Sequence, residues 1–242
     1  MTFLRSLIFN ILFTAWAFIA SVIYAPLFII APTRAGRPWA RGALWLAKIV
    51  LGITHEIKGL EHLTNQPVIY ASKHQSAWDT CIFLTLLDAP CYVLKHELLR
   101  IPFWGWYLWR MGMIAIDRSG STSTMKQMLR DAKTRISEGR TIIIYPEGTR
   151  TKPGATPDYH PGIVALYSQL NVPVIPVALN SGLFWGKNAF LKKPGKITLT
   201  FLPPIPPGLR KAEFMGMLQS QIETESQNLC AHPTASLPNS AK

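Results

Sequence analysis

The chain has 242 residues, enough for one large domain or for one domain with an appendage. Apolar residues make up 48% and charged residues only 16%, which excludes intrinsic disorder and disfavours a fully soluble protein. The net charge of +12 is compatible with nucleic acid, anionic lipid or phosphorylated small molecules as partners, and the apolar N-terminus favours lipid.

The first fifty residues predict a membrane segment. No Asp, Glu, Lys, Arg or His occurs from residue 6 to residue 33, a run of 28. Residues 6–25 alone would form a helix of about 30 Å, long enough to cross the hydrocarbon core of a bilayer. Pro26 and Pro32 are expected to interrupt or end this helix.

A second apolar helix is expected after Arg34, opening near Pro38 and ending by residue 51, either against the first helix or in the headgroup layer. Cations after the first helix outnumber the one before it, so that side is expected to face the cytoplasm, at the cell membrane. Crossing the bilayer and entering one leaflet both remain open. The apolar run is too long for a cleaved signal peptide. Its apolar character continues all round the helix, which argues against a buried helical hairpin in the core of a soluble protein.

Beyond residue 52 the pattern changes to short alternating runs. Strands are expected at residues 54–58, 67–72, 91–94, 114–116, 141–145, 174–179 and 196–201. Helices are expected at residues 77–87, 103–111, 123–138, 161–170 and 209–230. This alternation predicts an α/β fold, a mixed sheet flanked by helices and preceded by a hydrophobic two-helix membrane motif. The expected units are residues 1–52, residues 53–230 and a loose tail at residues 231–242.

Common cofactor and nucleophile signatures are absent from the sequence. It contains no G-x-x-x-x-G-K, G-x-G-x-x-G or G-x-S-x-G motif. Cys81, Cys91 and Cys230 lack C-x-x-C spacing and are too few for a disulfide framework. Neither such a framework nor a zinc site is expected, and no metal is expected.

The first chemical candidate is the run K-H-Q-S-A-W-D at residues 73–79, which follows a strand and opens a helix. His74 and Asp79 can meet if His74 lies in the turn and Asp79 in the first helical turn. The carboxylate would then hold one imidazole nitrogen and leave the other free as a general base. The competing interpretation is a capping box from Ser76 to Asp79 that only satisfies the helix start.

The second candidate is Y-P-E-G-T-R at residues 145–150, directly after a buried strand. Ligands in open α/β sheets bind beyond the carboxyl ends of strands. Glu147 is suited to bind a hydroxyl and Arg150 a phosphate, while Gly148 permits close approach. The alternative is a tight turn with two surface charges.

Two further blocks carry weaker signals. A strand ends in Asp117 and Arg118, where Arg118 could bind phosphate or simply form a surface ion pair. Residues 172–177 place two prolines in an apolar strand. This indicates an edge strand or a bent wall beside an acyl pocket, or else a plain core strand.

In this order and spacing, the four blocks resemble the glycerolipid acyltransferase family, with the lysophosphatidic acid (1-acyl-glycerol-3-phosphate) acyltransferases as the nearest group. The resemblance covers residues 50–205, and the apolar N-terminus also fits. It implies a membrane-bound enzyme that moves a fatty acyl group from coenzyme A or acyl carrier protein to a glycerol hydroxyl. His74 would act as the base and Asp79 as its orienting group. Substrate binding would fall to Arg118, Glu147, Gly148, Thr149, Arg150 and Lys95.

The chain departs from the family pattern at two positions. Lys73 stands where the first block often begins with Asn, and His160 stands where a lysine often precedes the glycine of the later motif. Both departures alter the charge near the acceptor headgroup. The expected product is phosphatidic acid. Alternative acceptors for the same reaction are lyso-ornithine lipid, glycerol-3-phosphate or another lysophospholipid.

Two other classes compete with an enzyme. One is a non-catalytic membrane-binding protein with the same fold, against which the intact His74–Asp79 pair argues. The other is a nucleic-acid binder, which would interleave aromatic residues with exposed cations. Here the aromatics cluster at residues 103–109 and in the N-terminal run, so no nucleic acid is expected as a partner.

Overall fold

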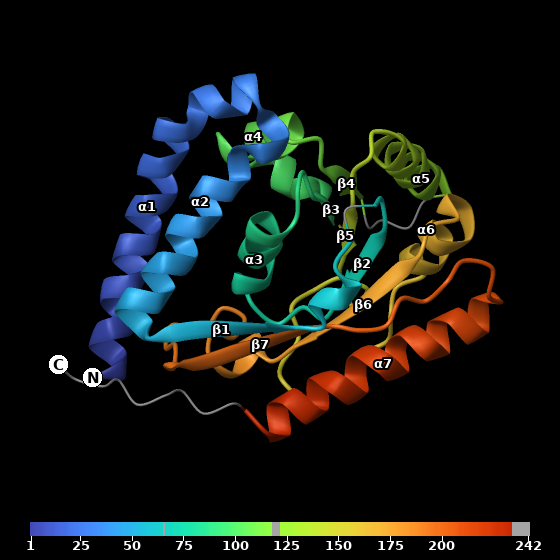
Figure 1. Ribbon diagram of the computed structural model, residues 1–242. Coiled ribbons are helices and arrows are strands. Elements are labelled where there is room, and N and C mark those ends of the chain that lie inside the picture. The colour runs from blue at the N-terminus through green and yellow to red at the C-terminus, as the bar shows by residue number, and fades with distance from the viewer. Residues whose placement is uncertain (65, 118–121, 234–242) are drawn as a thin grey trace.

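The computed structural model describes residues 1–64, 66–117 and 122–233. Within these residues, seven strands form one sheet in the order β1-β7-β6-β2-β5-β3-β4 (Figure 1). Their bounds are β1 Ile53–Lys58, β2 Ile69–Ser72, β3 Cys91–Lys95, β4 Ile114–Ile116, β5 Ile142–Ile144, β6 Val174–Leu179 and β7 Gly195–Phe201.

The sheet is mixed, as predicted. Strand β2 pairs in parallel with β5 and β6, strand β3 pairs in parallel with β4 and β5, and β1 pairs in parallel with β7. The one antiparallel pair among the described strands joins β6 to β7. Strands β2, β5 and β6 are buried at every position, as expected for strands covered on both faces.

Side chains that alternate along the central strands build two separate cores. On β2, Tyr70 packs into one core, while Ile69 and Ala71 pack into the other. The first core includes α3, and the second includes α5, α6 and α7. These helices are α3 Trp78–Leu86, α4 Trp104–Arg110, α5 Thr122–Ser137, α6 Gly162–Leu170 and α7 Lys211–Ala231.

From residue 53 onward, every predicted helix and strand lies within two residues of its expected bounds. Of the alternatives for residues 172–177, the structure shows a core strand: β6 lies between β2 and β7, so it is not an edge strand. Pro176 is tolerated there because β7 pairs only with Val177 to Leu179, so the missing N–H faces no ladder partner. The predicted tail lies outside the described residues from residue 234 on.

The N-terminal hairpin consists of α1 Thr2–Ile30 and α2 Pro32–Leu46, continued by a π-helical turn at Ala47–Leu51. The predictions that Pro26 interrupts the first helix and that the second opens near Pro38 are wrong, since both prolines lie inside helices. Tertiary contacts hold the end of α1: the Arg110 guanidinium donates to the Phe28 and Ile29 carbonyls, at 3.2 and 2.9 Å.

Small residues let the hairpin pack closely. The buried positions of α2 are Ala35, Gly36, Ala40 and Ala43. A β-carbon at Gly42 would lie 1.9 Å from the Trp16 ring, so the glycine is needed for the contact between the two helices. Helix α2 thus lies between α1 and α3, at the flank of the sheet (Figure 1).

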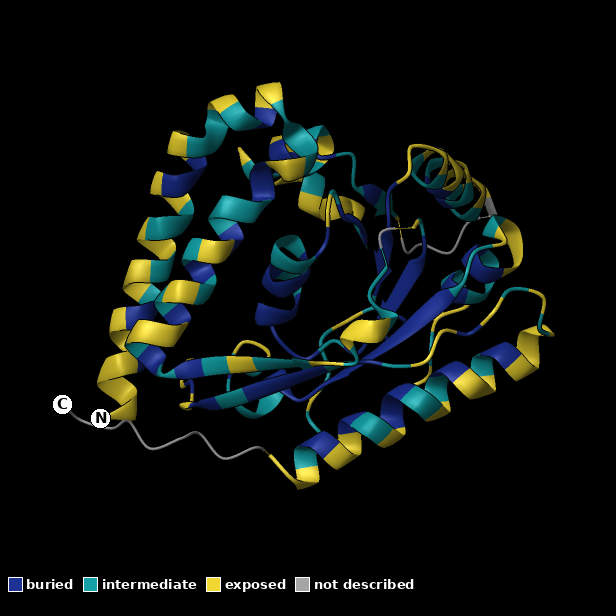
Figure 2. Ribbon diagram, in the orientation of Figure 1, coloured by how far each residue is buried: buried dark blue, intermediate teal, exposed yellow. Residues whose placement is uncertain are grey.

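The outer face of α1 has no partner. Figure 2 shows exposed residues repeating along its length, opposite the buried side that faces α2. By length and composition α1 is apolar enough to cross a membrane, and only 22% of its most apolar window is buried. The exposed large apolar side chains of this helix are Phe3, Leu4, Leu7, Ile8, Ile11, Leu12, Phe18, Ile19, Val22, Ile23, Ile29 and Ile30.

Candidate active site

The two chemical motifs meet at the carboxyl ends of neighbouring parallel strands. Ala71 of β2 is paired with Ile144 of β5, so the turns that follow these strands leave the sheet side by side. The first turn carries residues 73–79 and the second carries residues 145–151. This edge of a parallel sheet is where open α/β folds bind ligands.

His74 and Asp79 are in hydrogen-bond contact, with 3.0 Å between His74 Nδ1 and Asp79 Oδ2. His74 lies in the turn and Asp79 is the second residue of α3, the arrangement that the spacing requires. A carboxylate oxygen accepts, so Nδ1 carries the proton and the lone pair of Nε2 is left free. The His74 side chain is 14% exposed and lines a cavity, whereas Asp79 is fully buried.

Asp79 also organises the turn itself. Its Oδ2 accepts hydrogen bonds from the backbone N–H groups of Gln75 and Ser76, at 2.7 and 2.8 Å. Its Oδ1 accepts from the Ser181 hydroxyl at 2.6 Å. Asp79 therefore makes both kinds of contact expected from the sequence: it binds N–H groups at the start of the helix, and it binds the His74 ring. Ser181 follows β6 in the chain, and no sequence signal singled it out.

Tyr145 fixes the plane of the imidazole. Its ring stacks on the His74 ring with 3.9 Å between centroids and 18° between planes. Burial raises the pKa of Tyr145 well above its ordinary value, so the phenol is neutral and carries a proton to donate. The Tyr145 hydroxyl is buried and has no hydrogen-bond partner in the described part of the chain.

The 145–151 turn binds the backbone of His74 on both sides. Glu147 Oε1 accepts from the His74 N–H at 2.9 Å, and the Thr151 N–H donates to the His74 carbonyl at 2.8 Å. The Thr151 hydroxyl donates to Glu147 Oε2. Gly148 has a φ of 67°, a conformation that favours glycine and closes the turn.

Glu147 is a buried residue of the second turn. It is only 3% exposed, its two oxygens are bound to the protein, and it lines neither of the cavities described below. Burial raises its pKa to about 7, against the opposing effect of nearby Lys73. That Glu147 binds a substrate hydroxyl stays a prediction. In this structure its carboxylate supports the turn that carries His74 from behind.

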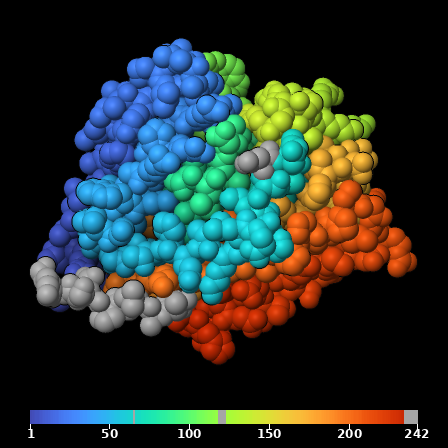
Figure 3. Space-filling model, in the orientation of Figure 1, coloured from blue at the N-terminus to red at the C-terminus, as the bar shows by residue number. Residues whose placement is uncertain are grey.

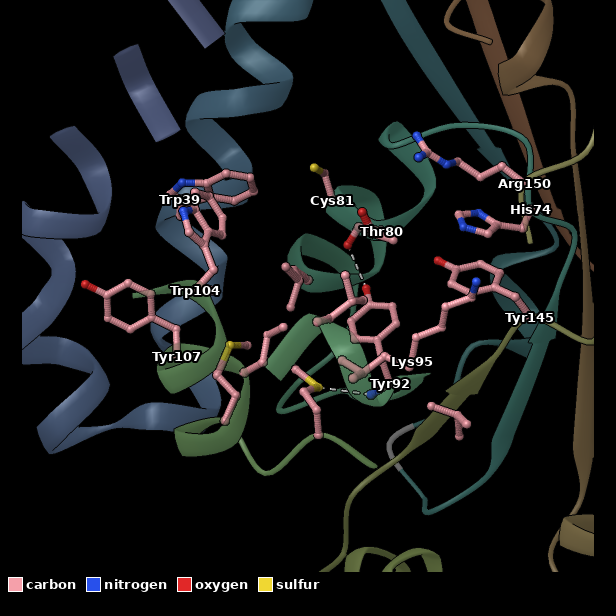
Figure 4. A pocket seen from close by; sticks show the side chains of 18 of the residues that line it. Trp39, His74, Thr80, Cys81, Tyr92, Lys95, Trp104, Tyr107, Tyr145 and Arg150 are labelled. Carbon is pink, nitrogen blue, oxygen red and sulfur yellow. Dashed lines mark hydrogen bonds between the residues drawn. The ribbon is translucent and has the colours of Figure 1, made fainter. Parts of the chain in front are cut away.

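A cavity of about 490 Å³ extends from His74 to the N-terminal hairpin. This volume falls within the range of about 300–1,000 Å³ that is usual for small-molecule pockets. Figure 4 shows His74, Tyr145 and Arg150 at one end and Trp39, Trp104 and Tyr107 at the other. The far end is apolar, and Phe28, Leu84 and Met111 also line the cavity and pack with Tyr107.

Three cations surround the polar end of this cavity: Lys95, Arg150 and Lys187. None of them forms an ion pair with a carboxylate of the described residues. Lys187 Nζ donates to the Thr149 hydroxyl at 3.0 Å. Sequence reasoning missed Lys187, because it lies in a loop without a motif, and the predicted Arg118 lies outside the described residues.

A second cavity, of about 440 Å³, lies beyond Tyr145. It shares Val93, Tyr145 and Gly148 with the first and is otherwise lined mostly by apolar side chains of β4, α5 and α6. His160, the second departure from the family pattern, lines this cavity and not the one beside His74.

Comparison with known proteins identifies the family. A family model described as Acyltransferase matches residues 54–180, which include both motif turns. The chain belongs to the acyltransferase family. The family assignment and the α/β fold predicted from the sequence are thereby confirmed.

Individual relatives of this acyltransferase are also similar in sequence. The 1-acyl-sn-glycerol-3-phosphate acyltransferase of Pseudomonas aeruginosa is 36% identical over 205 residues, covering 83% of this chain and 80% of that protein. The mouse 1-acyl-sn-glycerol-3-phosphate acyltransferase alpha is 31% identical over 163 residues, covering 66% of this chain and 57% of the mouse protein.

A solved structure has the same fold. The crystal structure of the 1-acyl-sn-glycerophosphate (LPA) acyltransferase PlsC from Thermotoga maritima matches 98% of this acyltransferase and 100% of that chain, with a TM-score of 0.80 and 20% identity. The likeness extends over the N-terminal hairpin as well as the α/β region.

Proposed function

We propose that this enzyme transfers a fatty acyl group from a thioester to the free sn-2 hydroxyl of 1-acyl-glycerol-3-phosphate, giving phosphatidic acid. The observation that carries the proposal is the His74–Asp79 pair at the polar end of a cavity whose other end is apolar. The names of the relatives support the acceptor. The thioester is a co-substrate, and the proposed steps use side chains of this chain alone.

In the proposed mechanism, His74 Nε2 takes the proton of the acceptor hydroxyl as its oxygen attacks the thioester carbon. The negative Asp79 stabilises the imidazolium that forms. The C–S bond then breaks, and the departing thiolate takes the proton from the imidazolium, which leaves an ester and a free thiol. General base catalysis of this kind contributes about 10²–10⁴-fold, and positioning of the two substrates must supply much of the rest.

We assign the apolar end of the cavity to the acyl chain of the donor. Trp39 and Tyr107 bring the N-terminal hairpin and α4 into its wall, so the chain would lie between the hairpin and the sheet domain. The cations around the polar end suit phosphate groups, which occur in the acceptor, in coenzyme A and on acyl carrier protein.

We further propose that α1 enters one leaflet of the bilayer instead of crossing it. Both ends of the helix contact the α/β domain: Lys192 Nζ donates to Asn10 Oδ1 at 2.7 Å, and Arg110 binds the Phe28 and Ile29 carbonyls. A crossing helix would carry one of these cations into the hydrocarbon core, at a cost of several kcal/mol. Because the cations follow the first helix, we propose that the enzyme lies on the cytoplasmic face of the cell membrane.

The leaflet proposal predicts that charge on the outer face of α1 weakens membrane binding. Ile11 and Val22 are 60% and 74% exposed, and inserting each side chain into lipid contributes roughly 1.5–3 kcal/mol. The double variant Ile11→Lys/Val22→Lys is expected to cosediment at least about tenfold less with vesicles of phosphatidylethanolamine and phosphatidylglycerol. Met217→Lys, an exposed apolar position on α7, is the matched control. Equal sedimentation of the double variant would contradict the assignment.

The function itself is tested with a panel of substrates. Purified enzyme in vesicles is incubated with labelled acyl-coenzyme A or acyl carrier protein and with 1-acyl-glycerol-3-phosphate, glycerol-3-phosphate, lyso-ornithine lipid and lysophosphatidylethanolamine. Labelled phosphatidic acid is the expected main product. A preference for another acceptor would retain the chemistry and change the substrate, and no transfer to any acceptor would favour a non-catalytic membrane protein.

Arg150→Ala is expected to weaken use of the phosphorylated acceptor. A hydrogen bond to a charged group contributes about 1.5–3 kcal/mol, so KM for 1-acyl-glycerol-3-phosphate should rise about ten- to hundredfold. KM for the neutral acceptor 1-acylglycerol should stay nearly constant. Lys152→Ala, an exposed cation two residues away that lines neither cavity, is the control. An unchanged KM for the phosphorylated acceptor would remove the role proposed for Arg150.

A further inference from the structure

A buried cluster of charges lies directly behind the catalytic turn and takes no part in the mechanism above. Lys73, the residue before His74, is 1% exposed. Its Nζ lies 2.8 and 2.7 Å from the two carboxylate oxygens of Glu223 and 2.8 Å from the Ala155 carbonyl oxygen. The ammonium thus uses its donors on groups within the protein.

The second carboxylate of the cluster is Glu147. Its Oε1, the atom that accepts from the His74 N–H, lies 3.6 Å from Lys73 Nζ. One buried ammonium therefore stands between two buried carboxylates. Tyr159 donates its hydroxyl to Glu223 Oε1 at 2.8 Å, so Glu223 has donors besides Lys73, whereas Lys73 is the only cation paired with Glu147 in the described chain.

Glu223 comes from a distant part of the chain. It lies on α7, which packs along the sheet on the side away from the hairpin (Figures 1 and 3) and falls outside the residues that match the family model. Lys73 stands where the resemblance to the family expects Asn. The cation at this position, Lys73, is thus accompanied by a carboxylate on α7, Glu223. A buried charge requires such a partner of opposite sign.

We propose that the Lys73–Glu223 ion pair positions the catalytic turn, with Lys73 supplying the charge that holds the Glu147 carboxylate on the His74 amide. This inference rests on the proposed function. Without Lys73, two carboxylates would face each other in a buried site, and one of them would take up a proton. A protonated Glu147 is a weaker acceptor for the His74 N–H, and the turn that aims the imidazole would loosen.

The charges around Glu147 give this role a definite pH dependence. Burial raises the pKa of Glu147 to about 7, Lys73 lowers it, and Glu223 raises it. Activity that needs ionised Glu147 falls as the pH drops through that pKa. The titratable groups facing this cluster from the packed elements are Lys73 and His74 of the β2–α3 turn, Tyr159 before α6, and Glu223 and Cys230 of α7.

Opposite shifts are therefore expected from the two partners. In Lys73→Met the pKa of Glu147 rises by about one unit or more, since a neighbouring opposite charge typically lowers a carboxyl pKa by about 1–3 units. In Glu223→Gln that pKa falls, because Lys73 then faces Glu147 alone. The acid limb of the pH–kcat profile should move up in the first variant and down in the second.

The rate at pH 8 provides a second readout. Lys73→Met should lower kcat about 10²-fold, the loss that a misplacement of about 1 Å causes, with a smaller effect on the KM of the acceptor. Adding Glu223→Gln to Lys73→Met removes one of the two facing carboxylates and should restore part of kcat. Glu225→Gln, on the same helix and outside the cluster, is the matched control.

The experiment measures wild type and variants as full-length enzyme in vesicles, with acyl-coenzyme A and 1-acyl-glycerol-3-phosphate. The Glu147 carboxyl is also titrated by NMR in ¹³C-Glu-labelled protein, assigned with Glu147→Gln, which requires no turnover. The proposal is supported if the Glu147 pKa and the acid limb move in opposite directions in Lys73→Met and Glu223→Gln, and if the double variant regains part of kcat. Parallel losses of thermal stability with an unchanged acid limb and an unchanged Glu147 titration would overturn it. If Lys73→Met does not fold, Glu223→Gln alone decides through the sign of its shift. An inactive wild type with the expected titrations would instead refute the proposed function.

Discussion

His74→Ala is expected to reduce acyl transfer by at least about 10²–10⁴-fold, the contribution usual for a positioned general base. The imidazole lines the cavity, and its Nδ1 is held by Asp79, so the free Nε2 is the group available to take the hydroxyl proton. Alanine at position 74 keeps the backbone N–H that donates to the Glu147 carboxylate, so the turn retains its main-chain hydrogen bonds. Transfer from labelled acyl-coenzyme A in vesicles measures the loss.

Two observations separate loss of chemistry from loss of structure in this variant. Circular dichroism and vesicle cosedimentation of His74→Ala should match the wild type, since the imidazole is a member of neither core. His62→Ala, in a short helical turn after β1, is the histidine control and should retain activity. Normal turnover by His74→Ala would leave Asp79 with its capping role alone.

The position of the proposed catalytic pair was predictable because it depends on short-range geometry. A buried strand, a turn and a helix start within residues 69–79 dictate that His74 and Asp79 can meet, and the structure places their side chains 3.0 Å apart. That residues 145–150 follow the carboxyl end of a buried strand was predictable in the same way. Their place beside the first turn was not, because it depends on the pairing of β2 with β5.

The contacts that complete the site could not be read from the sequence. Ser181 and Lys187 follow β6 and carry no motif, and they reach the site only because β6 pairs with β2. Glu223 lies on an amphipathic helix, where a carboxylate is most often solvated. Such contacts depend on strand order, which a single sequence with local signals does not specify.

Two departures from local preference, at Glu147 and at Pro26, have physical causes of the same kind. Glu147 has the charge of a surface turn residue, yet Thr151, Lys73 and the His74 amide compensate it in a buried place. Pro26 is unfavourable inside an isolated helix, and Arg110 stabilises the following turn from outside the helix. In each case a tertiary contact outweighed a local preference.

Asp79→Asn isolates the electrostatic part of the mechanism, because asparagine has nearly the shape of aspartate. The amide oxygen can take the place of Oδ2 and accept from the Gln75 and Ser76 N–H groups, while the amide nitrogen donates to the Ser181 hydroxyl. The turn is therefore expected to persist, with a Tm within a few degrees of the wild type.

What Asp79→Asn removes is the negative charge 3.0 Å from His74 Nδ1, which in the proposed mechanism stabilises the imidazolium as the proton is taken. We expect kcat to fall about 10²–10⁴-fold, with KM for the acceptor nearly unchanged, because Asp79 is fully buried and touches no part of the cavity. Ser181→Ala is the matched comparison: it removes one neutral donor to Asp79 and leaves the charge, so its loss in kcat should be far smaller. Equal losses in both variants would mean that the geometry of the turn, and not the carboxylate charge, limits the reaction.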